Sequence, residues 1–342
     1  MFAAARVTLK QHHFEVAVAA LAAVAASALG ASIAWRIDAL GVSKGCLDRV
    51  IASQDGFSAG QECFALVREG SGILGETFLT GQGTVALSIM GVLPFLLGLV
   101  GGVPIVAREL EARTAQTAWT LSASRWRWLA HQVAPIAIVL GAVMLLAAFA
   151  AGPVADASVA WGRSAASLIG LHGPLAVVRA FAAFGVGLLL GALLGRSLPA
   201  LFLGIAISVA LLFVVGILRD TWTASLEPGV IAEISPETGE YQLEPRAETT
   251  GWGVVTPDGR LLSSDEAREI ATAAGVPAAP PDDVQDIPAL TWYEENGYVL
   301  LPMGVSDDMA LGWAPYDGLI FGLVGAISIA GAVVVVNRRR PT

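Results

Sequence analysis

Two cysteines are the residues of this chain best suited to covalent chemistry. Cys46 and Cys63 are the only cysteines, and both lie in a polar, glycine-rich stretch between two apolar runs. If that stretch lies outside the cytoplasm, a disulfide between them can persist, and closing the loop contributes roughly 3 kcal/mol in the chain-entropy model. Two unpaired thiols or a metal site are the alternatives. Because no histidine lies nearby, we favour the disulfide.

The other reactive side chains do not form a recognised catalytic or metal-binding motif. The four histidines lack metal-ligand spacing, and no G-x-x-x-x-G-K-[ST] phosphate loop is present. Acidic pairs such as Asp282–Asp283 could bind a divalent cation. However, no D-x-[DN]-x-[DN]-G loop accompanies them, and a solvated acidic face is the commoner outcome. We therefore expect no catalytic residue, metal or cofactor in this chain, and we do not expect an enzyme.

A charged, tryptophan-rich segment, Ala107–Gln132, interrupts the apolar sequence. It begins as a charged helix, RELEARTAQTAW, that continues from the preceding apolar run. A break at Ser122–Ser124 follows, with a serine as the expected helix cap, and RWRWLAHQ leads into the next apolar run. Tryptophans flanked by arginines are typical of a membrane interface, and an ordinary positive-inside loop is the alternative. The predicted anchor residues are Arg125, Trp126, Arg127 and Trp128.

Six apolar runs position these groups. Each is about 20 residues long, enough to cross a hydrocarbon core of roughly 30 Å. Hydrophobic residues make up 55% of the chain, and the mean hydropathy is +0.67. The sequence therefore predicts an all-α polytopic membrane protein with six transmembrane helices, the first too long for a cleavable signal peptide. The predicted spans are Phe14–Trp35, Val85–Val106, Val133–Ala151, Leu175–Gly195, Leu198–Leu218 and Gly318–Val336.

Basic residues concentrate on one side of these spans. An even number of spans places both termini on one side, and the cluster Arg338–Arg340 makes that side the cytoplasm. With this topology, the short cytoplasmic segments hold ten of the chain's 20 lysines and arginines. These ten are Arg6, Lys10, Arg108, Arg113, Arg125, Arg127, Arg196, Arg338, Arg339 and Arg340.

The segment between the fifth and sixth spans is predicted to be a small external α+β domain. It carries 18 acidic against four basic side chains between Arg219 and Pro315, so its charge is −14 while that of the whole chain is −9. An acidic external part on a basic membrane part argues against nucleic acid as a partner. The pieces IAEISPETGEYQL, WGVVTPDGRLL and WYEENGYVLL predict hairpins, the last at Asn296–Gly297. Ser263 and Glu266 form a capping box for a helix that stops near Gly275.

Four parts follow along the chain. Residues 1–13 are predicted to form a basic amphipathic helix in the membrane interface, and a frayed terminus is the alternative. Residues 14–218 form five spans, with an external disulfide loop at 36–83 and a cytoplasmic segment at 107–132. Residues 219–315 form the acidic external domain, and residues 316–342 form the sixth span and a basic cytoplasmic tail.

Glycines recur at every fourth position of the fourth span, at Gly187, Gly191 and Gly195. Small residues at this spacing let two helices approach closely in lipid. We favour packing within the chain over a dimerisation face, although the spacing suits both.

The ionisable residues of the spans are few. Glu15, Arg179 and Asp317 each lie within about a turn of a span end. An ion-coupled transporter needs such groups near the middle of the membrane, so no built-in ion relay is predicted. If the protein moves a substrate uphill, the energy must come from another subunit.

The segment Ala107–Leu129 resembles the region between the second and third spans of ATP-binding-cassette (ABC) exporter permeases of the type-2 family, in the six-span kind common in high-GC bacteria. The family's pattern is close to A-R-E-x-E-x-x-T-x-x-x-A-W-T-x-S-x-S-R-x-R-W-L. The matching residues are Arg108, Glu109, Glu111, Thr114, Ala118, Trp119, Thr120, Ser122, Ser124, Arg125, Arg127, Trp128 and Leu129.

Two further pieces resemble the family. The opening VTLKQHHFEV matches at Gln11 and His12, and GALLGRSLPA is similar to the turn between the fourth and fifth spans. The cysteine pair in the first external loop is also usual in such relatives. The resemblance covers most of residues 1–218, but MGVSDDMALGWAPYDG before the last span departs from the family's sequence there.

The resemblance implies a permease subunit in the bacterial cell membrane that exports a drug, a lipid or a peptide. Two six-span units, identical or different, would form the pathway, and each would bind a cytoplasmic ATPase subunit that holds ATP and Mg²⁺. The ATPase would seat on a coupling helix from Arg108 to Trp119. The residues implied in this coupling are Arg108, Glu109, Glu111, Arg113, Thr114 and Trp119.

Two other classes of protein stay open at this point. A membrane-anchored sensor or scaffold would bind a peptide or cation with its external domain and signal through the same cytoplasmic segment. A channel or secondary carrier is disfavoured by the scarcity of intramembrane charge.

Overall fold

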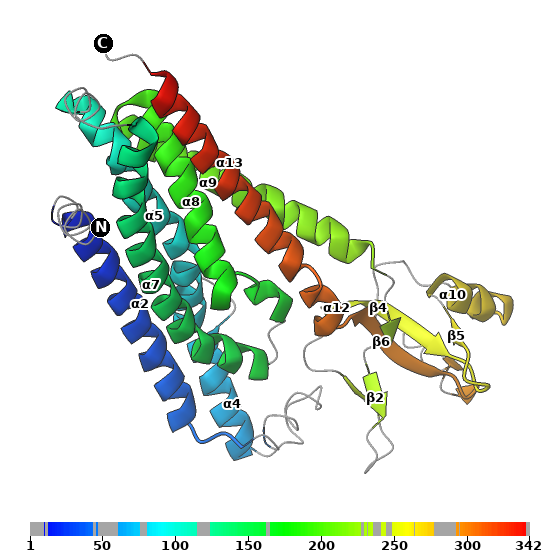
Figure 1. Ribbon diagram of the computed structural model, residues 1–342. Coiled ribbons are helices and arrows are strands. Elements are labelled where there is room, and N and C mark those ends of the chain that lie inside the picture. Colours follow the sequence, from blue (N-terminus) through cyan, green and yellow to red (C-terminus); the bar gives the residue numbers. More distant parts are fainter. Residues whose placement is uncertain are drawn as a thin grey trace.

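The computed structural model describes residues 10, 13–43, 46, 61–75, 81–114, 124–161, 165–226, 229–230, 232–234, 241–243, 248–262, 264–276, 292–293 and 295–339. Within these residues, six helices are long and apolar enough to cross a membrane, and they form a bundle (Figure 1). They are α2 (His13–Ala39), α5 (Gln82–Glu111), α7 (Arg125–Ala160), α8 (Gly173–Leu194), α9 (Ser197–Ala224) and α13 (Ala314–Arg338). The six predicted spans are confirmed. The predicted interfacial helix at residues 1–13 lies almost wholly outside the described residues.

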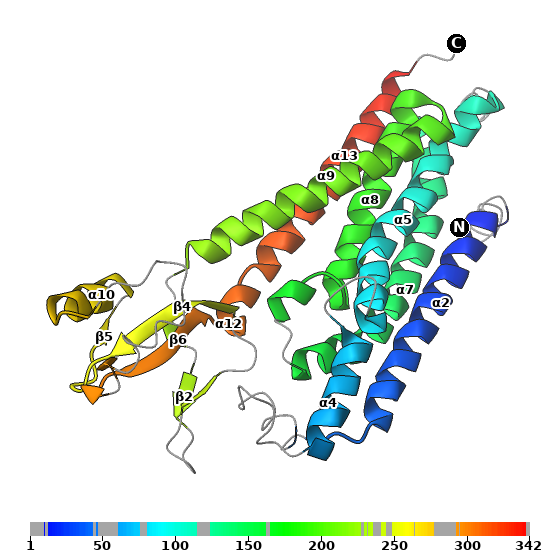
Figure 2. The same cartoon turned by 180° about the vertical axis from the view of Figure 1, so that it is seen from behind.

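The helices alternate in direction along the bundle. Helices α5, α8 and α13 end where α2, α7 and α9 begin, and Figures 1 and 2 show the two ends of the chain near this end of the bundle. We call it the basic end. It holds Arg108, Arg113, Arg125, Arg127, Arg196, Arg338 and Arg339. The opposite end carries the strands and the disulfide, and we call it the sheet end.

The charged helix predicted from Arg108 to Trp119 is interrupted after Glu111, and residues 115–119 lie outside the described residues. Helix α5 continues beyond the predicted span to Glu111 and stops at Ala112. Arg113 has a φ of 56°, in the left-handed region that side chains other than glycine rarely adopt, and helical backbone resumes at Thr114. The coupling residues Arg108, Glu109 and Glu111 therefore belong to the last turn of a spanning helix. Trp119 lies outside the described residues.

The predicted serine cap is present at the start of α7. Ser124 is the N-cap, and its Oγ accepts a hydrogen bond from the backbone N–H of Arg127 at 3.3 Å. The helix then runs without a break into the third span, so the anchor residues Arg125 to Trp128 form its first turn.

Glycines hold α5 against α8 at the centre of the bundle. A Cβ at Gly98 would lie 2.4 Å from the Ala180 carbonyl oxygen, and one at Gly102 would lie 2.3 Å from the Phe184 carbonyl oxygen. Only glycine permits so close an approach of two backbones. Apolar burial gives little driving force between helices in lipid, so this close contact is the main attraction available.

Helix α8 also packs closely on α13. A Cβ at Gly185 would meet the Gly325 carbonyl oxygen at 2.7 Å. Helix α9, by contrast, diverges from α8 toward the sheet end (Figure 2) and buries only Ala200, Gly204, Ser208 and Val215. The bundle is therefore organised around α8.

The strands lie between α9 and α13 in the sequence and form two antiparallel units. Strands β1 (Gly229–Val230), β6 (Val299–Val305), β4 (Glu248–Val255) and β5 (Leu261–Leu262) pair in that order, and β2 (Ala232–Ile234) pairs with β3 (Tyr241–Leu243). Helix α10 (Ser264–Ala273) packs on β4 and β5. The first two predicted hairpins and the predicted helix are present.

The third predicted hairpin, at Asn296–Gly297, is wrong. Trp292 and Tyr293 are helical, and β6 pairs with β4 and β1 instead of with the residues before Asn296. The aromatic rings explain the difference. Tyr293 packs edge-on against Tyr298 and is buried, and its hydroxyl donates to the Ala267 carbonyl oxygen of α10 at 2.6 Å. This burial raises the pKa of Tyr293.

The close approach of α5 and α8 gives a direct test. We expect Gly102→Ala to destabilise the purified protein by about 1–3 kcal/mol, because the added methyl group must displace backbone. Gly216→Ala is the matched control, since a Cβ there meets nothing within 4 Å in α9. It should leave thermal stability in detergent unchanged or slightly raised. Equal melting temperatures for the two variants would contradict the packing described.

Candidate functional site

At the basic end, Glu111 caps helix α9. The Glu111 Oε1 accepts from the backbone N–H of Ser197 at 2.8 Å, and its Oε2 accepts from the Ser197 Oγ at 2.9 Å. Ser197 is the first residue of α9, where backbone N–H groups lack partners and the helix dipole favours a carboxylate. Glu111 thus joins the end of the second span to the start of the fifth.

Two arginines cap helix C-termini at the same end. Arg125, at the start of α7, donates to the Asn337 carbonyl oxygen at 3.1 Å and also to the carbonyl oxygen of Arg339, beyond the end of α13. Arg339 in turn donates to the carbonyl oxygen of Ala192 at the end of α8. Cations at helix C-termini satisfy orphan carbonyls and complement the helix dipole. Arg125 therefore caps α13, and its role as an anchor in the membrane interface stays a prediction.

The end of α5 makes two further polar contacts. Arg108 pairs with Glu15 of α2 at 2.7 Å, and only 9% of the Glu15 side chain is exposed. The Thr114 hydroxyl donates to the Glu109 carboxylate across the turn at Arg113. The first contact ties α5 to α2, and the second fixes the turn itself.

These contacts leave a compact polar surface that we call the coupling surface. It consists of the end of α5 with the turn at residues 112–114, the first turn of α7 and the turn between α8 and α9. Its exposed charged side chains are mostly basic, and no group of three potential metal ligands occurs in the described part of the chain. Such a surface suits the docking of a partner protein. The exposed basic residues on it and beside it are Arg108, Arg113, Arg127, Arg196 and Arg338.

The two anchor tryptophans differ in their surroundings. Trp126 is 53% exposed. Trp128 packs against the buried cluster that includes Leu129 and Ile136. One ring is therefore available to the membrane interface, and the other fixes the first turn of α7 to the bundle.

The glycines predicted for helix packing fall in two settings. A Cβ at Gly187 would lie 3.1 Å from the Val103 backbone nitrogen, and one at Gly191 would lie 2.6 Å from the Val103 carbonyl oxygen, so both face α5. Gly195 is instead the C-cap of α8, with a φ of 63° and the Arg339 guanidinium beside it. It permits the turn into α9.

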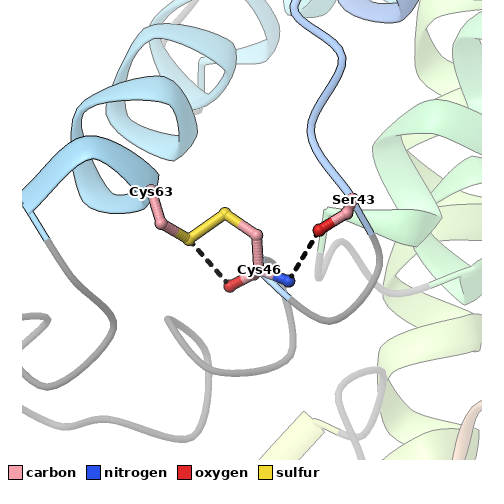
Figure 3. Close-up of a disulfide and its surroundings, with 3 residues drawn as sticks. All are labelled: Ser43, Cys46 and Cys63. Atoms are coloured by element: carbon pink, nitrogen blue, oxygen red, sulfur yellow. Dashed lines mark hydrogen bonds between the residues drawn. A yellow bond between two sulfur atoms is a disulfide. The ribbon is translucent and has the colours of Figure 1, made fainter.

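The two cysteines form a disulfide at the sheet end (Figure 3). Their Cα atoms are 5.8 Å apart, and the Cys46 backbone N–H donates to the Ser43 Oγ at 3.2 Å. Cys63 belongs to α4 (Gln61–Leu74), and Val67 of the same helix packs beside the disulfide. The disulfide thereby ties the start of α4 to the chain that follows α2.

An ion pair at the sheet end joins Arg179 and Asp317, which the sequence analysis did not predict to form a pair. The Arg179 Nη2 lies 2.8 Å from the Asp317 Oδ1, and the Arg179 Nε donates to Oδ2 at 3.1 Å. The two side chains are 10% and 2% exposed. The pair links α8 to α13, and the guanidinium also lies over the Phe321 ring, 5.1 Å from its centroid. Two opposite charges in separate apolar runs were the available signal for it.

Comparison with protein families now adds to this geometry. The family model described as ABC-2 membrane transporter related matches residues 15–219. The chain belongs to this family. No curated protein and no solved structure matches the chain.

The ABC-2 match covers five of the six spanning helices, from α2 to α9. It includes the whole coupling surface and both cysteines. The chain is therefore a multi-pass membrane protein and a component of membrane transport. The strands and α13 lie beyond the matched residues.

The buried ion pair in this ABC-2 protein predicts a non-additive response to mutation. Arg179→Leu alone should destabilise the protein by about 3–5 kcal/mol, because it leaves the Asp317 carboxylate buried and unpaired. The double variant Arg179→Leu/Asp317→Leu should recover most of that loss, because neither charge remains. Denaturation of the purified protein in SDS–detergent mixtures measures both.

The exposed pair Arg268–Asp265 supplies the control for this experiment. Its side chains are 50% and 88% exposed, so Arg268→Leu should change stability by less than about 1 kcal/mol. If the double variant at residues 179 and 317 were as unstable as the single one, the pair would not be the source of the effect.

Proposed function

We propose that the chain is the permease subunit of an ABC exporter in a bacterial cell membrane. A separate cytoplasmic ATPase, which holds ATP and Mg²⁺, docks on the coupling surface and drives transport. The observation that carries this proposal is the cap that Glu111 places on α9. It gives the segment expected to receive the ATPase a direct connection to a second spanning helix.

The distribution of charge supports a cytoplasmic position for the basic end. Short segments rich in arginine stay in the cytoplasm, and seven arginines lie at this end in the described residues. The disulfide lies at the opposite end, and disulfides persist outside the cytoplasm. In this orientation the acidic domain of residues 219–315 is external.

The contacts of the coupling surface suggest how a movement would spread. A displacement of the turn at residues 112–114 moves Glu111 and, through it, the first turn of α9. A displacement of the first turn of α7 moves Arg125 and, through its bonds to carbonyl oxygens, the end of α13. Closure of the ATPases would therefore move the start of α9 together with the end of α5, and the end of α13 together with the start of α7.

The substrate class in this proposal is a hydrophobic or amphipathic molecule, such as a drug, a lipid or a peptide. The six spanning helices are apolar, and the pathway would lie between two permease subunits, either two copies of this chain or two related chains. Lipids surround the outward faces of the helices.

Labelling of introduced cysteines tests the orientation. Glu269→Cys lies on the exposed face of α10, and Arg113→Cys lies in the exposed turn after α5. The native cysteines are joined in a disulfide and do not react with maleimide. A membrane-impermeant maleimide should label Glu269→Cys in intact cells and Arg113→Cys only after permeabilisation, by at least about tenfold. The reverse pattern would refute the proposed orientation.

Charge reversal at the turn tests docking of the ATPase. The permease is co-produced with the ATPase encoded beside it and purified by a tag on the permease. Arg113→Glu and Glu109→Lys should each reduce recovery of the ATPase by about tenfold or more, because each reverses a charge in the contact. The control is Glu269→Lys, an exposed reversal at the other end of the molecule.

Glu111→Ala separates docking from coupling in the same preparation. Loss of the α9 cap should leave ATPase recovery unchanged while substrate-stimulated ATP hydrolysis in proteoliposomes falls severalfold. If no variant changes recovery or stimulation, the coupling surface is not the ATPase site. If no ATPase is recovered with the unmodified chain, a sensor or scaffold becomes the better interpretation.

A further inference from the structure

A cavity of about 760 Å³ opens at the sheet end of the bundle. It lies between the last turns of α7, the short helix η2 (Ala165–Leu168) with the turn after it, the start of α8 and the region where α12 (Asp307–Leu311) leads into α13. Helix α12 contacts η2 across it. The volume falls within the roughly 300–1,000 Å³ typical of small-molecule sites.

The walls of the cavity are mostly apolar. Val159 comes from α7, Leu168 and Ile169 from η2 and its following turn, Leu175 from α8 and Leu311 from α12. Leu168 and Ile169 are 1% and 7% exposed, so this wall is fixed by the packing behind it. An apolar wall of this kind takes the hydrophobic body of a ligand.

Two polar side chains line the same cavity. Asp156 is exposed on α7, and no basic side chain in the described part of the chain pairs with its carboxylate. His172 is the N-cap of α8, and its buried Nδ1 has no hydrogen-bond partner among the described residues. A carboxylate only accepts hydrogen bonds, so Asp156 suits a ligand that carries N–H donors.

The positive charge of Arg179 does not reverse the preference of the cavity for a ligand with N–H donors. Arg179 lies behind the cavity wall, where a Cβ added to Gly170 would be 2.0 Å from the Arg179 Cζ. Its guanidinium is paired twice with Asp317, so its charge is neutralised. The segment of residues 219–315 at the same end carries a charge of −14, which raises the local concentration of cations.

The cavity also lies at the depth in the membrane where an amphiphile places its charged head. Asp156 is 28 residues beyond Trp128 along α7, or about 42 Å at 1.5 Å per residue. The hydrocarbon core is only about 30 Å thick. With Trp128 near one interface, Asp156 reaches the headgroup region of the other, where an amphiphile places its charged head.

We propose that this cavity binds a drug-sized amphiphile with a protonated amine. The ammonium group lies on the Asp156 carboxylate, and the apolar body lies against Val159, Leu168 and Leu311. The inference deepens the proposed function by naming a substrate class, and only the statement that the bound amphiphile is transported rests on that function. Binding itself needs no ATPase.

The test is a displacement experiment on the permease alone in lipid nanodiscs, with empty nanodiscs subtracted. The fluorescent amphiphilic amine quinacrine is the probe, and dodecylamine, dodecanol and dodecanoate are the competitors. Dodecylamine should displace the probe at a concentration at least about fivefold lower than dodecanol does, because only its ammonium group pairs with the partly exposed Asp156 carboxylate. Dodecanoate should be the weakest competitor. Equal potency of the three, or preference for dodecanoate, would overturn the proposal.

Two variants and a control locate the site. Asp156→Asn should weaken the binding of dodecylamine about fivefold and leave the binding of dodecanol unchanged. Asp308→Asn removes the same charge from an exposed position of α12 that does not line the cavity, and it should change neither. Val159→Trp should place a large ring on the apolar wall of the cavity and weaken the binding of both competitors. Unchanged binding in Asp156→Asn and Val159→Trp would place quinacrine elsewhere and overturn the proposal, whether or not ATP-driven transport is found.

Discussion

The close contact between α5 and α8 is the constraint on which the rest of the structure depends. Lipid is as apolar as the helices, so burial of leucine or valine gives little attraction between them. Gly98, Gly102 and Gly191 instead bring backbone against backbone, within distances that a methyl group would prevent. Because α8 uses another face to meet α13, this one helix fixes the positions of both neighbours.

That arrangement determines what the helix ends can do. Once α5 and α8 lie side by side, the tight turn at Gly195 and Arg196 brings the start of α9 next to the end of α5. Glu111 then reaches Ser197, and a residue that could have contacted a partner protein caps a helix of its own chain. The caps at the basic end join helices that the core leaves less connected, above all α9. A partner that pulls on the end of α5 therefore acts on α9 directly.

The sequence predicted what depends on local composition and missed what depends on tertiary pairing. The six spans, the Ser124 cap and the hairpins with Pro-Glu-Thr-Gly and Pro-Asp-Gly turns all follow from short-range patterns. The end of α5 at Glu111 does not, because RELEARTAQTAW has no glycine or proline to stop a helix, and Arg113 adopts the left-handed conformation. Asn296–Gly297 is a strong hairpin signal, yet packing of Tyr293 against Tyr298 and Ala267 overrides it. The contacts of Glu111, Arg125 and Arg339 join residues about 85 to 215 positions apart, so no local pattern could reveal them.

The placement of the intramembrane charges bears on the source of energy. The sequence identified Glu15, Arg179 and Asp317 as ionisable residues of the spans. The structure pairs the first with Arg108 and the other two with each other. The Arg179 guanidinium occupies both carboxylate oxygens of Asp317 in a buried site, so both charges serve as a link between helices. These charges join helices, α2 to α5 at one end and α8 to α13 at the other. In a member of the ABC-2 family, this use of the few available charges agrees with an energy source that lies outside the membrane and acts through the coupling surface.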